Sequence, residues 1–486
     1  MAATTLPTDP ELGLERNAVG LTEVLFQSIT HMAPAAAVAF SIIFATTYSG
    51  GATPLAVVIA LIGCLLVANS IGQLAQHLPS AGGLYTYNAR GLGDAVGFLV
   101  AWGFILAEPL VAPLLYLIFA YVVAGTLTTH LHTPAELWIL FAILAGLIVW
   151  ALTYFGVRLS TRTGVLLGAF EIVVFLALAV TLIIAAGGRN TLAVFSPTTG
   201  TANGLGSVFP GMIFAILAFV GFEAAAPLGE EARNPRRTVK LAVLLSCFLI
   251  GLFYVLTYYA ATVYFGPARM AADFYGFNNA DPWTGLATEV WGAGWIVVFL
   301  AVANSAIANS NAASTAATRV AYAMGRIGLL PAAFARVHPV HRTPVTAVHV
   351  QGAGGIIVAV LLGLVLGGPL PAFSLIGSTV TLIVIGIYIL TNISCTVFYA
   401  RERRNEFNPL MHLVFPVLGV LAFIPAVIAS LGIGFLGIQI QPLAYPVSLA
   451  PILILAWMAL GVVVLASLLA RGRDRLARTG EIFQEG

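Results

Sequence analysis

Four titratable side chains interrupt long apolar stretches of this 486-residue chain. Glu108 precedes a proline, Glu171 follows Ala-Phe, Glu223 ends the stretch Phe-Val-Gly-Phe-Glu, and His31 lies three residues before Pro34. An ionisable residue at membrane depth is costly and is therefore a functional hypothesis by default. A carboxylate there attracts an ammonium group or takes up a proton, and an imidazole titrates near neutral pH. These residue types predict cation recognition or proton transfer.

Each of these side chains also has a structural interpretation. Glu108 fits a buried acid paired with a hydroxyl, and Glu171 fits an acid near the cytoplasmic edge of its helix. Glu223 lies just after an interruption of its run at Gly221, which favours hydrogen bonds to backbone N–H groups and a gating or structural task over direct substrate contact. His31 fits a donor to a carbonyl that Pro34 leaves free. The sequence leaves both sets of interpretations open.

The elements that must position these residues are apolar helices. Hydrophobic residues make up 60% of the chain and charged residues 8%, against about 25% charged residues in soluble domains. A spanning helix needs about 20 mostly apolar residues, and such long continuous runs exclude strands. The runs predict an all-α integral membrane protein with twelve spanning helices at 21–48, 53–77, 95–126, 134–155, 162–187, 205–228, 239–265, 292–323, 344–366, 371–400, 410–433 and 447–470.

Basic residues predict the orientation of these helices. Every Arg and Lys except Arg189 and Arg269 falls at a terminus or in alternate gaps between the apolar runs. Short loops rich in Lys and Arg stay cytoplasmic. We therefore expect a multi-pass protein of the inner (cell) membrane, surrounded by the lipid bilayer, with cytoplasmic tails at 1–20 and 472–486. The outer loop 276–291 is expected to form a short helix over an outer vestibule.

Two runs are unsuited to a continuous helix. Pro34 lacks a backbone N–H and clashes with the preceding turn, and Gly221 lies among aromatic residues shortly before Pro227. Paired interruptions in helices one and six, at the start of two five-helix halves, indicate the binding site of an inverted-repeat transporter. Free N–H groups at such breaks suit an anion and free carbonyls suit a cation. A simple kink or a packing glycine is the alternative.

The breaks and the nearest carboxylate make up the predicted site. The residues expected to bind substrate are Ala33, Pro34, Ala35, Ala36, Ala37, Phe219, Val220, Gly221, Phe222 and Glu108. The residues expected to serve coupling or gating are Glu171, Glu223 and His31.

Four motifs carry a resemblance to a known family. Residues 79–87 read Pro-Ser-Ala-Gly-Gly-Leu-Tyr-Thr-Tyr, and the stretch at 219–223 continues to Glu-Glu-Ala-Arg-Asn-Pro-Arg-Arg at 230–237. Residues 319–326 read Arg-Val-Ala-Tyr-Ala-Met-Gly-Arg, and His338-Pro339 precedes Thr343-Pro344. In these motifs the chain resembles the amino acid–polyamine–organocation (APC) superfamily of transporters.

The resemblance implies a LeuT-type fold and a transport activity. Helices 1–10, within 21–400, would form the 5+5 inverted-repeat core with broken helices 1 and 6, and helices 11 and 12, within 401–471, would lie outside it. The implied activity is import of an amino acid by alternating access, coupled to protons, with sodium as the alternative ion. Phe219 and Phe222 would form the lid and wall of the site. Glu171 lies near a position where some proton-coupled relatives carry a lysine.

The first break departs from the family pattern. Family members usually have a Gly–Ser/Thr–Gly turn there, whose N–H groups hold an amino acid carboxylate, whereas this chain has Pro34-Ala35-Ala36-Ala37. Putrescine-importing relatives also carry a proline near this point. The resemblance therefore keeps a polyamine or monoamine as the alternative substrate, and amino acid exchange as the alternative activity.

Other function classes lack their sequence patterns. Ser, His and Asp never gather at nucleophile spacing and no GxxxxGK[ST] motif is present, so we expect neither an enzyme nor an ATP-driven pump. Cys64, Cys247 and Cys395 show no metal spacing, and no cofactor is expected. No basic run suggests nucleic acid, and we expect a monomer or weak homodimer. Neither the repeated polar stripes of a channel nor the soluble domain of a sensor is present.

Overall fold

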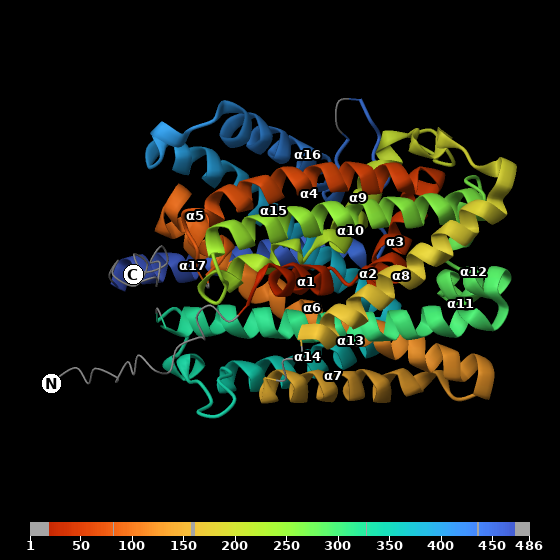
Figure 1. Ribbon diagram of the computed structural model, residues 1–486, viewed down its shortest axis with the longest axis horizontal. Helices are drawn as coiled ribbons and strands as arrows, with labels where there is room; N and C mark the ends of the chain where they lie inside the picture. The colour runs from red at the N-terminus through yellow and green to blue at the C-terminus, as the bar shows by residue number, and fades with distance from the viewer. Residues whose placement is uncertain (1–18, 81, 157–160, 327, 435–436, 472–486) are drawn as a thin grey trace.

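The long helices of the protein run side by side along one axis (Figure 1). The computed structural model describes residues 19–471 except 81, 157–160, 327 and 435–436, so most of each predicted tail lies outside the described residues. Among the residues described, the only β-type pairings are the isolated bridges Val19–Ala232 and Val337–Pro344. The predicted all-helical class is confirmed.

The α-helices follow one another with short connections. They are α1 (Leu21–His31), α2 (Pro34–Ala36), α3 (Ile42–Ser49), α4 (Thr53–Ala75), α5 (Leu84–Leu92), α6 (Asp94–Leu131), α7 (Trp138–Phe155), α8 (Thr161–Ala186), α9 (Leu205–Phe219), α10 (Pro235–Phe265), α11 (Phe277–Ala280), α12 (Pro282–Trp291), α13 (Trp295–Arg326), α14 (Val345–Val365), α15 (Pro369–Arg401), α16 (Phe415–Ser430) and α17 (Ala450–Arg471). Two irregular helices matter for the site: the π-helix η2 (Ala37–Ser41) and the 3₁₀ helix η7 (Phe222–Glu230).

Ten helical stretches in the described part of the chain are long and apolar enough to cross a membrane, or eleven if one bent pair counts as a span. One of them, Leu21–Ala75, covers the predicted span 21–48 and all but the last two residues of the predicted span 53–77, which meet at the 3₁₀ turn Gly50–Ala52. The chain is therefore a multi-pass membrane protein. Twelve spans and an inverted repeat stay predictions. Residues 276–291, where a short helix was expected, contain α11 and α12.

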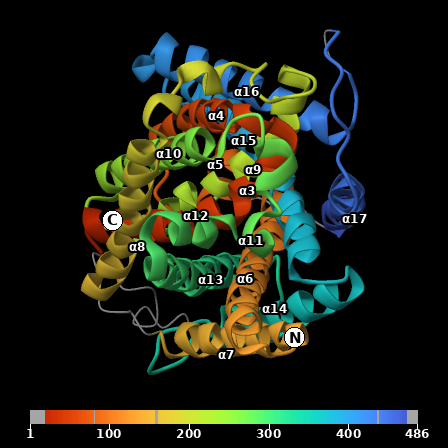
Figure 2. The same cartoon turned by 90° about the vertical axis from the view of Figure 1, so that its right-hand side faces the viewer.

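The outer helices surround a polar centre. Seen from one end, α7, α8, α16 and α17 lie at the rim, and α3, α5, α9 and α15 lie inside (Figure 2). Rim helices expose large apolar side chains, including Leu147 on α7, Val173 on α8 and Val463 on α17. The carboxylates predicted from the sequence are instead buried. Apolar side chains outside and polar ones inside are what a lipid environment requires.

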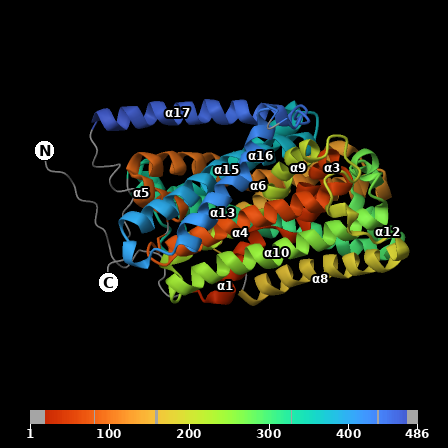
Figure 3. The same cartoon turned by 90° about the horizontal axis from the view of Figure 1, so that it is seen from above.

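Helix α17 stands apart from most of the bundle (Figure 3) and is fastened to α6 by two tryptophans. The indole N–H of Trp102 donates to the carbonyl of Trp457, and that of Trp457 donates to the carbonyl of Trp102, both at 2.9 Å. The two rings stack with centroids 4.7 Å apart. Each indole thus satisfies its single donor inside an otherwise apolar contact.

The first transmembrane helix is interrupted between α1 and α2. Ala33 adopts a left-handed conformation with φ +46° and ψ +67°, and the helix resumes at Pro34. The physical reason is the proline, which disfavours the helical conformation for the residue before it and fits the first position of a new helix. Helical structure then continues from Pro34 through η2 and α3 to Ser49.

The second interruption lies between α9 and η7. Val220 is extended, Gly221 has φ +118°, and the two helical pieces differ in direction by 41°. A Cβ atom on Gly221 would lie 2.7 Å from the carbonyl carbon of His31. The two breaks therefore touch, and glycine is needed both for its backbone conformation and for this close approach.

We predict that Gly221→Ala destabilises the protein by about 1–3 kcal/mol, because it combines a disfavoured backbone conformation with a clash against a buried carbonyl. The melting temperature of the purified protein in detergent measures this. Gly386→Ala on α15 is the matched control, since its Cβ would meet no atom within 4 Å. Equal melting temperatures for both variants and the wild type would contradict the close contact between the breaks.

Candidate functional site

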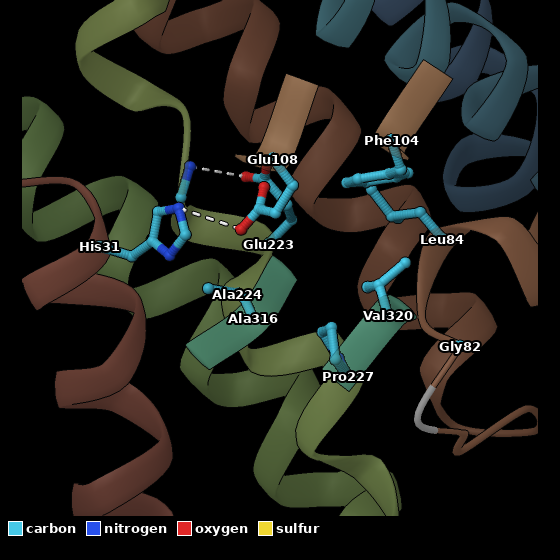
Figure 4. A pocket seen from close by; sticks show the side chains of 11 residues that line it. His31, Gly82, Leu84, Phe104, Glu108, Glu223, Ala224, Pro227, Ala316 and Val320 are labelled. Carbon is cyan, nitrogen blue, oxygen red and sulfur yellow. Dashed lines mark hydrogen bonds and ion pairs between the residues drawn. The ribbon is translucent and has the colours of Figure 1, made fainter. Parts of the chain in front are cut away.

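A narrow cavity opens where the two breaks meet (Figure 4). Its volume is about 20 Å³, room for about one water molecule. The imidazole of His31 and the carboxylates of Glu108 and Glu223 lie on one side of it, and apolar residues including Leu84 and Val320 lie on the other. Helices α1, α5, α6, α13 and η7 all contribute to the lining. The cavity lining named here holds two acidic groups and no Lys or Arg.

Glu108 pairs with His31 at the edge of the cavity. Its Oε1 lies 3.5 Å from Nε2 of the imidazole, and both side chains are buried. The other imidazole nitrogen, Nδ1, is buried without a hydrogen-bond partner among the described residues. Such an orphaned polar atom in a membrane interior is unusual. The pair is therefore suited to receive or pass a proton, or to meet a polar ligand.

Glu223 is held at the second break by two donors. The backbone N–H of Gly221 donates to its Oε2 at 3.0 Å, and the hydroxyl of Tyr388 on α15 donates to the same oxygen at 2.8 Å. Next to it, the hydroxyl of Ser28 donates to the carbonyl of Phe222 at 2.9 Å and accepts from the N–H of Ala225 at 3.1 Å. The start of η7 is thus joined to α1 and α15.

Glu171 lies at the first break, on α8, and outside the cavity lining. Its Oε2 accepts from the N–H of Ala35 at 3.4 Å, and its Oε1 accepts from the side-chain amide of Asn304 at 2.7 Å. The hydroxyl of Ser305 accepts from the N–H of Ala36 at 3.2 Å. Helices α8 and α13 therefore both supply acceptors to the first turn of the resumed helix.

Tyr254 on α10 joins the carbonyls that the two breaks set free. Its hydroxyl lies 2.7 Å from the carbonyl oxygen of Met32 and 2.9 Å from that of Ala218. Sequence reasoning missed this residue. A tyrosine in an apolar run signals that a partner is needed for its hydroxyl, but nothing in the sequence tells where that partner lies.

The backbone N–H and carbonyl groups at the two breaks were expected to remain unpaired and available to a bound solute. For the groups described above, this expectation is wrong. Their N–H and carbonyl groups are already bound by side chains from other helices. The physical reason is the absence of water in a lipid interior, where an unpaired backbone group costs several kcal/mol.

The remaining predicted residues lie around this centre. The ring of Phe219 packs edge-on against Tyr254, with centroids 5.4 Å apart, and that of Phe222 packs against Tyr388 at 5.3 Å. Both phenylalanines are buried and neither lines the cavity, nor does Val220 or any residue from Ala33 to Ala37. Of the predicted site, the structure gathers His31, Glu108, Gly221 and Glu223 around one space. The other lining residues were not predicted as site residues: Gly82, Leu84, Phe104, Ala224, Pro227, Ala316 and Val320.

We predict that Tyr254→Phe destabilises the protein by about 1–3 kcal/mol, since a buried carbonyl is left without its donor. Tyr259→Phe is the control: this tyrosine is partly exposed and its hydroxyl makes one long contact, 3.4 Å, to Asn190. Chemical or thermal unfolding in detergent measures the stability of both variants relative to the wild type. Equal stability of the two variants would argue against the bridging role of Tyr254.

Comparison with known proteins identifies the family of this chain. Residues 20–465 match the family model described as amino acid permease. The low-affinity putrescine importer PlaP of Escherichia coli (strain K12) is 26% identical over 459 residues, covering 93% of each chain. The branched-chain amino acid permease BcaP of Bacillus subtilis (strain 168) is 26% identical over 331 residues, covering 63% of this chain and 67% of BcaP.

A third relative, the glutamate/serine transporter AimA of Bacillus subtilis (strain 168), is 26% identical over 318 residues, covering 62% of this chain and 58% of AimA. The family match runs through nearly the whole helical bundle. The protein therefore belongs to the amino acid permease family of the APC superfamily and is a membrane transporter.

Proposed function

We propose that this permease imports a small organic ammonium compound, an amino acid or a related amine, by alternating access and with coupling to protons. The observation that carries the proposal is the acidic cavity at the meeting point of the two breaks, lined by Glu108 and Glu223. A buried pair of carboxylates needs cationic partners. An ammonium group supplies one positive charge and two or three donors, which suits this cavity.

The relatives support the same chemistry. By their names, PlaP imports putrescine, BcaP carries branched-chain amino acids and AimA carries glutamate and serine. All these compounds share a primary ammonium group, whereas their other groups differ. The ammonium group is therefore the feature that we carry over to this protein. We place the protein in the inner (cell) membrane with both termini cytoplasmic, because its basic loops alternate with its apolar runs.

Charge balance explains the proposed coupling. With both carboxylates ionised and the imidazole neutral, the cavity carries two negative charges, and one ammonium group leaves one uncompensated. For a substrate with one ammonium group and no carboxylate, a proton taken up together with it makes the loaded site neutral, which is the form that a low-dielectric interior tolerates best. We assign this proton to the Glu108–His31 pair, since the imidazole is able to pass it on.

Access to the cavity requires movement, because its present volume admits only about one water molecule. At the end of the bundle that we expect to be cytoplasmic, Arg319 of α13 pairs with Glu231 after η7 at 3.2 Å. The backbone of Val19 pairs with that of residues 231–233 in the same region. We propose that these contacts close the cytoplasmic side and separate when α1 and η7 move away from α13.

The proposal is tested by uptake into proteoliposomes, with amino acids and amines each assayed with and without an inward proton gradient, and with sodium replaced by potassium. We expect at least one ammonium compound to accumulate in response to the pH gradient and independently of sodium. Accumulation that requires sodium would refute the proton coupling. A panel in which no ammonium compound is transported would refute the function.

We predict that Glu108→Gln lowers gradient-driven uptake at least tenfold while the protein still reaches the membrane, because the variant loses both the negative charge and the proton acceptor. Glu136→Gln is the matched control, since Glu136 is exposed and lies outside the cavity. Uptake of the compound identified in the panel, normalised to protein amount, measures the effect. Full activity of the Glu108 variant would remove this residue from the mechanism.

A further inference from the structure

We infer that Glu171 takes the place of a substrate carboxylate at the first break and thereby restricts the substrate to amines without a carboxylate. The inference rests on the proposed function and narrows its substrate class. It starts from the general chemistry of a broken membrane helix, whose resumed half presents free N–H groups and the positive end of its dipole to an anionic substrate group.

In this protein the resumed half-helix is Pro34–Ser49. No residue in its first turn has a backbone N–H group left without an acceptor. Pro34 has none. Ala35 donates to Glu171 at 3.4 Å, Ala36 donates to Ser305 at 3.2 Å, and Ala37 donates to the carbonyl of Ala33 at 2.7 Å. The anion that such a helix start favours is therefore present as a side chain of the protein.

Glu171 is fixed in this place. Its second oxygen accepts from Asn304 at 2.7 Å, and its side chain is only 2% exposed. A substrate carboxylate that approached Ala35 would have to displace this side chain from its hydrogen bonds to Ala35 and Asn304. The position is therefore already filled.

At the second break, two N–H groups are likewise bound by side chains. The N–H of Gly221 is bound by Glu223 and that of Ala225 by Ser28. Meanwhile the cavity presents Glu108 and Glu223 to a cation. The cavity thus supplies carboxylates for ammonium groups, whereas the N–H groups of Ala35, Ala36, Gly221 and Ala225 are already bound by side chains.

Ligand pairs that differ only by a carboxylate test the inference: putrescine with ornithine, cadaverine with lysine, and isobutylamine with valine. Uptake into proteoliposomes and the shift in melting temperature give the preference for the amine over the amino acid. For the wild-type protein we expect a preference of at least tenfold in a pair that is transported. Glu171→Ala exposes the N–H of Ala35 and should lower this preference about tenfold or more.

Two further variants make the result specific. Glu171→Gln keeps the size of the side chain and an acceptor oxygen, so its preference should change much less than that of Glu171→Ala. Ser305→Ala exposes the N–H of Ala36 and also removes the Ser305 hydroxyl from beside Glu171. It should therefore lower the preference for the amine as well, and it provides the test if Glu171→Ala does not fold.

The possible outcomes distinguish a failure of this inference from a failure of the proposed function. Equal uptake of both members of a pair by the wild-type protein overturns this inference and leaves the proposed function intact. So does a wild-type preference that is unchanged in both Glu171→Ala and Ser305→Ala. If no member of any pair is bound or transported, the proposed function fails and this inference fails with it.

Discussion

Backbone groups exposed by a broken helix must find partners, because a lipid interior contains no water to supply them. This requirement shapes the centre of the protein. Side chains from α1, α8, α10 and α13 meet it, through Ser28, Glu171, Tyr254 and Ser305. Each contact joins segments far apart in the sequence. The breaks are therefore the points at which the surrounding helices are fastened together.

The same contacts determine how the protein can move. A typical hydrogen bond contributes only about 1 kcal/mol net, because its partners exchange one bond for another. Alternating access can therefore proceed if each broken-helix group passes from one partner to the next without becoming unpaired. The two breaks are in contact at Gly221 and His31. A displacement of α1 therefore acts directly on η7. In the proposed function, substrate and proton would bind beside this contact, at Glu108 and Glu223, where their charges would act on both half-helices.

Much of the fold could be predicted from the sequence, since the relevant signals are local. Apolar runs predict helices, Pro34 marks the first interruption, and Gly221 marks the second. His31, Glu108 and Glu223 could be chosen as site residues because titratable groups are rare in apolar runs. Even the loop at 79–87, known only as a family motif, supplies Gly82 and Leu84 to the cavity wall.

The partners of these groups could not be predicted, because they depend on how helices are rotated against one another. The direction in which Phe219 points is one example: its ring lies near Gly251 and Tyr254 rather than over the cavity. Glu171 is another. The sequence shows an acid within a helix, and only the packing of α8 and α13 around the first break shows which N–H group it binds.

The central claim is that the protein's own carboxylates occupy the helix breaks and leave the cavity to a cation. An experimental structure of the protein in lipid, determined with putrescine and separately with ornithine, tests it most directly. We expect a ligand ammonium group between Glu108 and Glu223, with Glu171 still on the N–H of Ala35. A ligand carboxylate bound to Ala35 and Ala36, with Glu171 turned away, would contradict the account.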